Sequence, residues 1–361
     1  MAGRFRVVDT GVMEGRFNIA IDQAMIEEHQ AGRIPDTFRF MRFPPTALIG
    51  RHQALRQEVD VEYCRTHGIG IVRRITGGGA IYLDEGQLGW GLVFHRTALG
   101  QVSLAEVASA ICQAVAAGLR RLGVNARYRP RNDIEVDGRK ISGTGGFFDG
   151  DTLIYQGTVL VDMDPAAMVA ALRVPRAKLE KRQLDSAAQR VVTLRELLGP
   201  ATPGLPAIQN ALLEAFSERF ELDWNSEPLS PAEQALAAKH HREEIGTDEF
   251  VAEVDDPAHD ADFAAGTHTG AGGTVTTYLR LEGAARKRIG QALITGDFFV
   301  APPRVVYDLE AALRGAYVTD ADGIIEQFFL ERPINALSVT AADFQAALDG
   351  ALAAARAQRP S

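Results

Sequence analysis

The spacing of apolar residues along the chain predicts helices alternating with strands. Segments in which apolar residues recur at three- and four-residue intervals are expected to be helices, and short or alternating apolar runs bounded by turn residues are expected to be strands. The predicted helices are 17–26, 59–67, 104–122, 165–172, 191–198, 207–220, 305–313 and 341–355. The predicted strands are 37–43, 47–51, 70–73, 89–94, 152–161, 274–281 and 289–294. Because strands follow one another between helices, the pattern indicates an α+β fold rather than a doubly wound parallel sheet.

The length and the distribution of turn residues predict two domains. A chain of 361 residues exceeds one ordinary domain, and a stretch rich in turn residues at 225–231 has the composition of a linker. We therefore expect a larger domain over 1–228 and a small α+β domain over 229–361. Within the small domain, 255–273 is rich in Asp, Ala and Gly and is predicted to be a mobile loop.

Charge and cysteine content exclude several classes of protein. A net charge of −9 argues against a general nucleic-acid binder. The two cysteines, Cys64 and Cys112, are too few for a disulfide framework, and no Cys/His spacing indicates zinc. The first six residues lack the apolar segment of a signal peptide, and no apolar run is long enough to span a bilayer. We expect a cytoplasmic protein with neither a nucleic-acid nor a membrane partner.

The stretch Arg73–Tyr82 combines two arginines with three consecutive glycines, Gly77, Gly78 and Gly79. Three adjacent glycines are poor helix or strand formers, but they suit a loop that approaches a ligand closely. Backbone N–H groups in such a loop bind anions, and paired arginines bind carboxylate or phosphate oxygens. The alternative is a tight turn between two strands with solvated arginines.

A second stretch, Asn132–Gly143, is predicted to form a β-hairpin around the turn Asp137-Gly138. Side chains alternate between the two faces of a strand, so the hairpin has an apolar face and a polar face. In a two-residue register the opposed pairs are Val136–Arg139, Glu135–Lys140, Ile134–Ile141 and Asp133–Ser142. The polar face thus carries an acid suited to Mg²⁺ and a lysine suited to a phosphate. The alternative is a plain Glu135–Lys140 cross-strand pair at the surface.

With these stretches the chain resembles the lipoate–protein ligase A family, within the wider biotin/lipoate ligase superfamily. The motifs that carry the resemblance are Ile49-Gly50-Arg51-x-Gln53, Arg73-Arg74-x-Thr76-Gly77-Gly78-Gly79-Ala80-x-Tyr82-x-Asp84, Asn132-Asp133-Ile134 with Gly138-Arg139-Lys140-Ile141-Ser142-Gly143, and Gly157-Thr158. The resemblance is good over 17–198 and looser in the last third. It implies a mixed or antiparallel sheet flanked by helices, and a small C-terminal domain that moves during the reaction. The turn Gly296–Phe299 looks like the element by which that domain meets the active site.

The resemblance also implies an activity and a set of site residues. The expected enzyme activates lipoate (or octanoate) with ATP and Mg²⁺ to give lipoyl-AMP, and transfers the lipoyl group to a lysine of a lipoyl-acceptor protein such as a lipoyl domain. Lys140 is expected to be the central catalytic cation, and Asp133 is expected to hold the metal ion. The residues expected to bind lipoate or lipoyl-AMP are Arg73, Arg74, Thr76, Gly77, Gly78, Gly79, Ala80, Tyr82, Asn132, Ser142, Gly143, Gly157 and Thr158.

The chain also departs from the family pattern at several positions. Leu83 and Gln156 stand where the family usually has histidine, Gln87 stands where it has asparagine, and Thr144-Gly145-Gly146 replaces a Ser/Asn-Ala type of sequence. The cations and glycines of the motifs are intact, so the expectation of ligase activity stands. Acyl-chain preference and the choice of acceptor remain open.

Three alternatives compete with the ligase. An octanoyl or lipoyl amidotransferase of the same fold would carry its acyl group on a cysteine, but Cys64 and Cys112 lie on predicted helices away from the motifs and are expected in the core. A biotin ligase would have a Gly-Arg-Gly-Arg run in its glycine loop. A non-catalytic acyl-carrier-binding module is the third alternative, and the presence of Lys140 argues against it.

Overall fold

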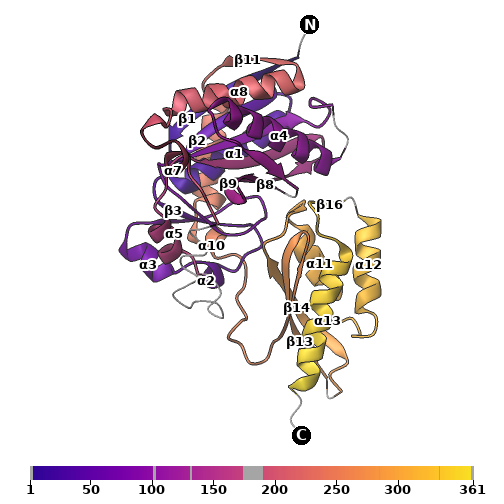
Figure 1. The fold of residues 1–361 in the computed structure, drawn as a ribbon. Coiled ribbons are helices and arrows are strands. Elements are labelled where there is room, and N and C mark those ends of the chain that lie inside the picture. Colours follow the sequence, from indigo (N-terminus) through magenta and orange to yellow (C-terminus); the bar gives the residue numbers. More distant parts are fainter. Residues whose placement is uncertain are drawn as a thin grey trace.

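The computed structural model describes residues 3–100, 103–130, 132–173, 190–283, 285–332 and 334–358. Figure 1 shows a large body that contains the N-terminal two thirds of the chain and a smaller one that contains the C-terminal strands and helices. The mixture of sheets and helices confirms the α+β fold class. No helix in these ranges combines the length and hydrophobicity needed to cross a membrane.

The large body is built on an eight-stranded sheet with the strand order β11-β1-β2-β6-β10-β9-β8-β7. β1 pairs in parallel with β2 and β11, and the other neighbours are antiparallel. A second sheet, β4-β3-β5, carries the glycine stretch between β4 and β5. The strands are β1 (Gly3–Val12), β2 (Thr37–Arg42), β3 (Thr46–Ile49), β4 (Gly70–Arg73), β5 (Ile81–Leu83), β6 (Gln87–His95), β7 (Arg127–Arg129), β8 (Asp133–Val136), β9 (Arg139–Asp149), β10 (Thr152–Leu160) and β11 (Leu222–Ser226).

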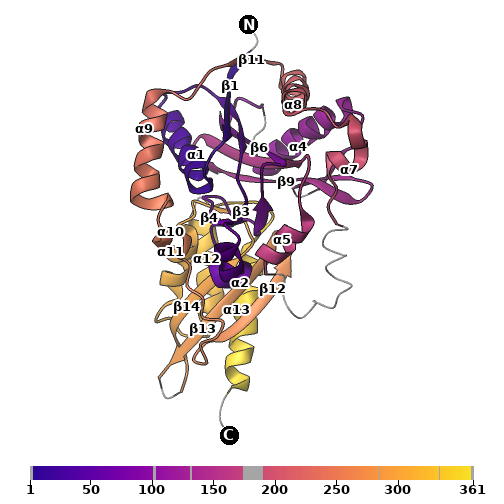
Figure 2. The same cartoon turned by 90° about the vertical axis from the view of Figure 1, so that its left-hand side faces the viewer.

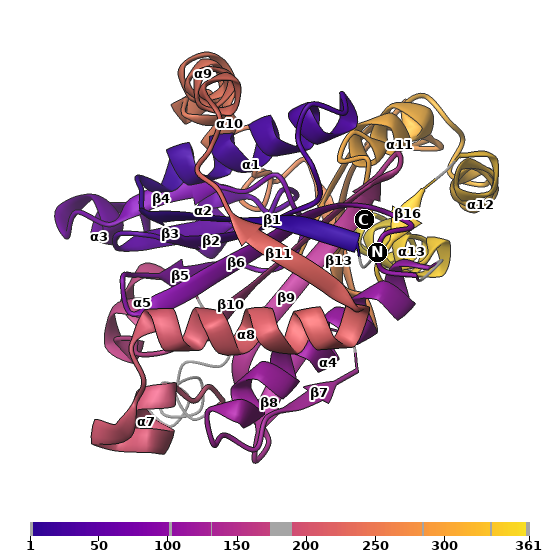
Figure 3. The same ribbon diagram turned by 90° about the horizontal axis from the view of Figure 1, so that it is seen from above.

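Helices cover both faces of the eight-stranded sheet. Seen from above, α1 (Gly15–Gln30) and α9 (Pro231–His240) lie on one side, whereas α4 (Leu104–Arg121) and α8 (Leu205–Phe220) lie on the other (Figure 3). The remaining helical segments are α2 (Leu55–Glu58), α3 (Val61–Thr66), α5 (Pro165–Ala171), α7 (Leu194–Leu198), η2 (Gly199–Ala201), η3 (His241–Ile245) and α10 (Asp248–Val251). The arrangement is a three-layer sandwich with a separate apolar cluster on each face of the sheet.

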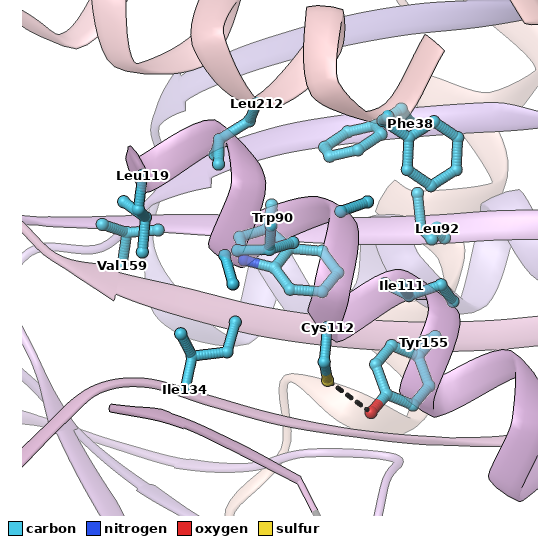
Figure 4. Packing of buried hydrophobic residues seen from close by; sticks show 14 of the residues in the cluster. Phe38, Trp90, Leu92, Ile111, Cys112, Leu119, Ile134, Tyr155, Val159 and Leu212 are labelled. Atoms are coloured by element: carbon cyan, nitrogen blue, oxygen red, sulfur yellow. Dashed lines mark hydrogen bonds between the residues drawn. The ribbon is translucent and has the colours of Figure 1, made fainter. Parts of the chain in front are cut away.

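The core between the sheet and the α4–α8 layer explains why these segments form. α4 starts with a capping box, in which Ser103 and Glu106 satisfy each other's backbone N–H groups, and its apolar stripe packs on the sheet. Trp90 on β6 and Tyr155 on β10 are completely buried there, as is Cys112 of α4 (Figure 4). Burying this much apolar surface is the main source of stability for the domain.

The small body has its own sheet and core. Its three-stranded sheet β12-β13-β14 is covered by α13, and α11 and α12 complete the cluster (Figure 2). Its elements are β12 (Ala264–Gly270), β13 (Gly273–Glu282), β14 (Arg288–Gly296), β15 (Val300–Ala301), α11 (Val305–Leu313), α12 (Ala321–Glu331), β16 (Asn335–Ala336) and α13 (Ala341–Ala357). Part of the expected loop 255–273 is therefore the strand β12, so that prediction is wrong for Ala264–Gly270.

Packing bears on where the two domains divide. α9 lies against α1, and its Glu233 forms a buried ion pair with Arg6 of β1 at 2.6 Å. Phe250 of α10 also belongs to the apolar cluster on the α1 face. The sequence analysis assigned this segment to the small domain, with the boundary after residue 228. We propose that the boundary lies after Val251 and that the small domain begins with β12.

Candidate active site

A cavity of about 480 Å³ lies where the glycine stretch, the β8–β9 hairpin and the small domain meet. Its size falls within the roughly 300–1,000 Å³ of ligand pockets. The apolar part of its lining includes Ile19, Met41, Phe43, Leu48, Leu83, Leu160, Met163, Met168 and Leu172. The polar part includes Arg74, Thr76, Asn132, Lys140, Thr144 and Thr158. A cavity that is mostly apolar with a few polar groups suits an acid with a long hydrocarbon tail.

The two arginines of the glycine stretch stabilise the backbone. Arg73 is completely buried, and its guanidinium donates to the carbonyl oxygens of Gly50, Arg51, Gln53, Phe250 and Val251 at 2.7–3.1 Å. All three guanidinium nitrogens thus donate to backbone carbonyl oxygens. Arg73 does not line the cavity, so its contacts give no support to the expectation that it holds lipoate or phosphate.

Arg74 shapes the glycine loop from inside. Its guanidinium donates to the carbonyl oxygens of Gly77 and Gly79 at 2.7–3.0 Å, and it also lines the cavity. Gly78 between them has a φ of 91°, a conformation that glycine adopts without strain. Burial lowers the pKa of both arginines to about 10, and each has an arginine neighbour that adds to the effect. A buried cation therefore fixes the conformation of the loop.

The hairpin differs from the predicted register by a β-bulge. Val136–Arg139 and Glu135–Lys140 are paired as predicted, and both turn residues have positive φ. Beyond a bulge next to Glu135, the pairs become Ile134–Ser142 and Asp133–Gly143, so the predictions for these pairs are wrong. The bulged strand has one extra residue, which turns the following side chains to the opposite face.

The bulge places Lys140 beside Asp133. The ammonium nitrogen of Lys140 lies 2.7 Å from Oδ1 of Asp133, and the lysine side chain remains 38% exposed. A Cβ atom at Gly143 would lie 2.6 Å from this nitrogen, so a side chain there would displace the end of the lysine. Glu135 pairs instead with Arg129 at 2.6 Å. Lys140 and Glu135 are thus opposite each other across the strands, but the ion-pair partner of the Lys140 side chain is Asp133.

Of the expected site residues Ser142 and Asn132, only Asn132 lines the cavity. The bulge turns Ser142 into the core, where its hydroxyl is buried without a hydrogen-bond partner in the structure, and it does not line the cavity. Asn132 lines the cavity and donates to the carbonyl oxygen of Thr144 at 2.7 Å, which ties β9 to the start of the hairpin.

The structure brings most of the expected site residues together around one cavity. Those that line it are Arg74, Thr76, Gly78, Gly79, Ala80, Tyr82, Asn132, Lys140, Gly143, Gly157 and Thr158. Those that do not are Arg73, Gly77, Asp133 and Ser142. The sequence analysis also missed polar residues of the wall. One is Asp22, which binds Arg39 and Gln156 at 2.6 Å each. Gln156 is another of these wall residues, and its position next to Gly157 was a signal in the sequence that could have identified it.

The small domain supplies one wall of the cavity. Asp297 and Phe299 from the turn after β14 line it, together with Leu337 and Ser338. The N–H of Gly78 donates to the carbonyl oxygen of Phe298 at 3.1 Å, so the turn touches the glycine loop directly. The expectation that Gly296–Phe299 meets the active site agrees with this geometry.

The acidic residues fit a metal ion only in part. No group of three or more His, Cys, Asp or Glu side chains in the described ranges is arranged to hold a metal. Asp22 and Asp297 line the cavity, and Asp133 lies next to it as the ion-pair partner of Lys140. Mg²⁺ is commonly bound by one or two carboxylates together with substrate phosphates and water. One carboxylate beside the cavity therefore fits a metal ion that substrate phosphates would also bind.

Comparison with known proteins points to one family with two activities. The family model for the lipoyl protein ligase A/B catalytic domain matches residues 14–217. Lipoate-protein ligase A subunit 1 of Thermoplasma acidophilum is 28% identical over 260 residues, which cover 69% of this chain and 96% of the relative. Octanoyltransferase LipM of Kyrpidia tusciae is 30% identical over 262 residues, which cover 64% of this chain and 95% of the relative. The relatives thus include both ligases and transferases.

Solved structures give the same picture. A bipartite lipoate protein ligase with its E2 lipoyl domain from Thermoplasma acidophilum has a TM-score of 0.63 and 27% identity, covering 71% of this chain and 98% of that one. A lipoate-protein ligase A bound with ATP has a TM-score of 0.60 and 26% identity, covering 70% of this chain and 99% of that one. LipL1 of P. falciparum, in complex with lipoate, covers 92% of this chain and 95% of its own with a TM-score of 0.71; at 16% identity it shows the shared fold alone.

Proposed function

The chain belongs to the lipoyl protein ligase A/B catalytic-domain family, and we propose that it is an ATP-dependent, AMP-forming lipoate–protein ligase. It would activate lipoate, or octanoate, as the acyl adenylate and then transfer the acyl group to a lysine of an acceptor protein. The ATP-bound ligase and the ligase with its lipoyl domain support this choice of substrates.

The observation that favours a ligase over an octanoyltransferase is the position of the two cysteines. A transferase that carries its acyl group as a thioester needs a thiolate at the cavity. Cys64 is buried under α5, where burial raises its pKa to about 11. Cys112 is buried in the other core beside Thr144 and Tyr155, where burial also raises its pKa. Neither lines the cavity, and the chain has no other cysteine.

In the first step a carboxylate oxygen of lipoate attacks the α-phosphorus of ATP. The bond from that phosphorus to the oxygen bridging to the β-phosphate breaks, and pyrophosphate leaves. Negative charge develops on phosphate oxygens, and a fixed cation is the most effective way to stabilise it. Lys140 has three donors, so its ammonium can keep Asp133 as a partner and still bind substrate oxygens. Asp133 would hold Mg²⁺, which would supply further charge neutralisation.

In the second step the amine of an acceptor lysine attacks the acyl carbon. The bond from that carbon to the AMP oxygen breaks, an amide forms, and the amine loses a proton. Lys140 stabilises the oxygen that becomes negatively charged, as it does in the first step. The apolar lining would hold the hydrocarbon tail, whose burial supplies binding energy.

The function is tested by measuring pyrophosphate release with ATP, Mg²⁺ and lipoate or octanoate. Lys140→Ala is expected to slow acid-dependent release by about 10²–10³-fold, as removal of a charge-stabilising donor does in other enzymes. Mass spectrometry of an added lipoyl domain is expected to show the mass of one lipoyl group. Lys239→Ala is the matched control, because that lysine is exposed on α9.

Two outcomes would contradict the ligase. If wild-type protein releases no pyrophosphate but moves an octanoyl group from an acyl-carrier thioester, it is a transferase, and Cys64 or Cys112 must be tested by replacement with serine. If it binds lipoate but does neither, it is a binding module.

A further inference from the structure

Phe299 of the small domain sits in a slot of the catalytic domain. A Cβ atom at Gly145 would collide with the tip of the Phe299 ring, and a Cβ atom at Gly78 would lie 2.6 Å from the same tip. The ring therefore fills the positions where both residues would carry side chains. It also packs against the core between the sheet and α4, to which Leu337 of the small domain belongs.

The backbone around Phe299 is fixed at the same place. The Phe298 carbonyl oxygen accepts from the N–H of Gly78 at 3.1 Å, and a Cβ atom at Gly77 would collide with that oxygen. The N–H of Gly296 donates to the carbonyl oxygen of His52 at 3.0 Å. The rings of Phe298 and His52 are stacked with their centroids 5.1 Å apart. The turn therefore docks through both its backbone and its rings.

Gly145 has no local reason to be glycine. It lies inside β9, opposite Gln156, and its φ is not positive. Glycine inside a strand weakens the strand and often marks a place where another group approaches closely. It is also part of the sequence Thr144-Gly145-Gly146 that departs from the family pattern. The ring of Phe299 is the group that approaches.

We propose that Phe299 is a positioning residue: seated between Gly78 and Gly145, it fixes the small domain where Asp297, Leu337 and Ser338 complete the cavity wall. Gly145 is glycine in this chain in order to admit the ring. The proposal goes further than the proposed function and rests on it only for the activity measurement. It predicts that Gly145 and Phe299 act as one coupled pair.

The coupling is tested with Gly145→Ala and a compensating change at Phe299. Gly145→Ala adds one methyl group, displaces the ring and is expected to lower kcat/KM for ATP in pyrophosphate release by about 10- to 100-fold, since small misplacements in a site have effects of this size. Phe299→Leu replaces the ring with a shorter side chain and so makes room for the methyl group. The double variant is expected to recover to the level of Phe299→Leu alone. Phe329→Leu, a change inside the small-domain core, is the control and should not rescue Gly145→Ala.

A second measurement follows the position of the small domain without using activity. Spin labels at Arg65→Cys and Leu330→Cys report the distance between the two bodies, because these side chains are 72% and 79% exposed and both native cysteines are buried. Wild type is expected to give one narrow distance distribution. Gly145→Ala should broaden it, and Phe299→Leu should restore it in the double variant. Phe299→Ala should broaden it without altering the catalytic sheet.

These results separate the proposal from its competitors. A wild-type distance distribution in Gly145→Ala, or no rescue by Phe299→Leu in either measurement, overturns it. Loss of activity with an unchanged distance distribution would mean that Gly145 contacts the substrate directly. If wild type releases no pyrophosphate, the proposed function fails, and the distance measurement still decides the role of Phe299.

Discussion

The glycine loop and the β8–β9 hairpin carry cations of opposite character on two sides of one cavity. In the loop, Arg73 and Arg74 are buried, and their donors bind backbone carbonyl oxygens. In the hairpin, Lys140 is partly exposed and has one carboxylate partner. A cation whose guanidinium nitrogens all donate to the backbone stabilises structure, whereas an ammonium with three donors and a carboxylate partner can also bind substrate. Proximity to a motif therefore does not decide the role of a charged residue.

Replacement of Arg73 gives the largest expected effect on stability. Arg73→Leu leaves several buried carbonyl oxygens unpaired, at about 1–3 kcal/mol for each such group, and should lower the free energy of unfolding by at least about 3 kcal/mol. Urea denaturation at equal protein concentration measures this. Arg65→Leu, which removes a guanidinium that is 72% exposed, should change stability by less than about 1 kcal/mol. Equal effects of the two replacements would break the distinction between a buried and an exposed cation.

Lowering the pH should reduce the free energy of unfolding through His52, which is buried next to Arg73. Burial, and then the charges of Arg51 and Arg73, lower the pKa of His52 to about 3, far below the 6.5 of the unfolded chain. The folded state thus favours the neutral ring, so the contribution of His52 to stability is complete above pH 6.5 and is lost as the pH falls. The loss reaches at most about 1.4 kcal/mol per pH unit.

His52→Phe removes the titrating group while keeping an aromatic ring next to Phe298. Its unfolding free energy should fall less steeply than that of wild type between pH 6.5 and 4.5, as measured by urea denaturation across this range. Parallel curves for the two proteins would show that His52 is not buried as a neutral ring. Such a result would mean that the region around Arg73 is as exposed to solvent as Lys140.

The smallest effect is expected at Glu135, on the hairpin. Its carboxylate pairs with Arg129 and not with Lys140. Glu135→Gln should therefore change stability by less than about 1 kcal/mol and leave pyrophosphate release at the wild-type rate. Asp133→Asn, in contrast, removes the partner of Lys140 and should slow release. A similar loss for both variants would mean that the two carboxylates share the lysine, contrary to the ion pairs of the structure.

The motifs were predictable because their local sequence limits the backbone. Asp137-Gly138 predicted the hairpin turn, and the alternation around it predicted the buried Ile134 and Val136. The bulge was not predictable, because nothing local indicates which strand carries the extra residue. The site residue Ser142 was misplaced for this reason alone. The burial of Arg73 also depends on carbonyl groups from α10, far away in the sequence.

The elements that the sequence analysis missed have little local pattern. β11 lies partly within the expected linker, and it exists because it pairs with β1 across the length of the domain. β1 is buried from Phe5 to Val8, but its pairing with β11 leaves no trace in either segment alone. α12 was missed as well, although its apolar residues Ala321, Ile325 and Phe328 do follow helical spacing. The spacing of these residues is enough by itself to predict a helix there.

The pairing of β1 with β11 has a consequence for how the chain folds during synthesis. Gly3 lies opposite Leu222, so more than two hundred further residues must be synthesised before β1 can pair with β11. At about 5–20 residues per second, that wait is on the order of 10–40 s. Until then one edge of β1 presents unpaired N–H and carbonyl groups, which are open to pairing with other chains. Aggregation of nascent protein should therefore be most sensitive to residues 3–7, although they lie far from the chemistry.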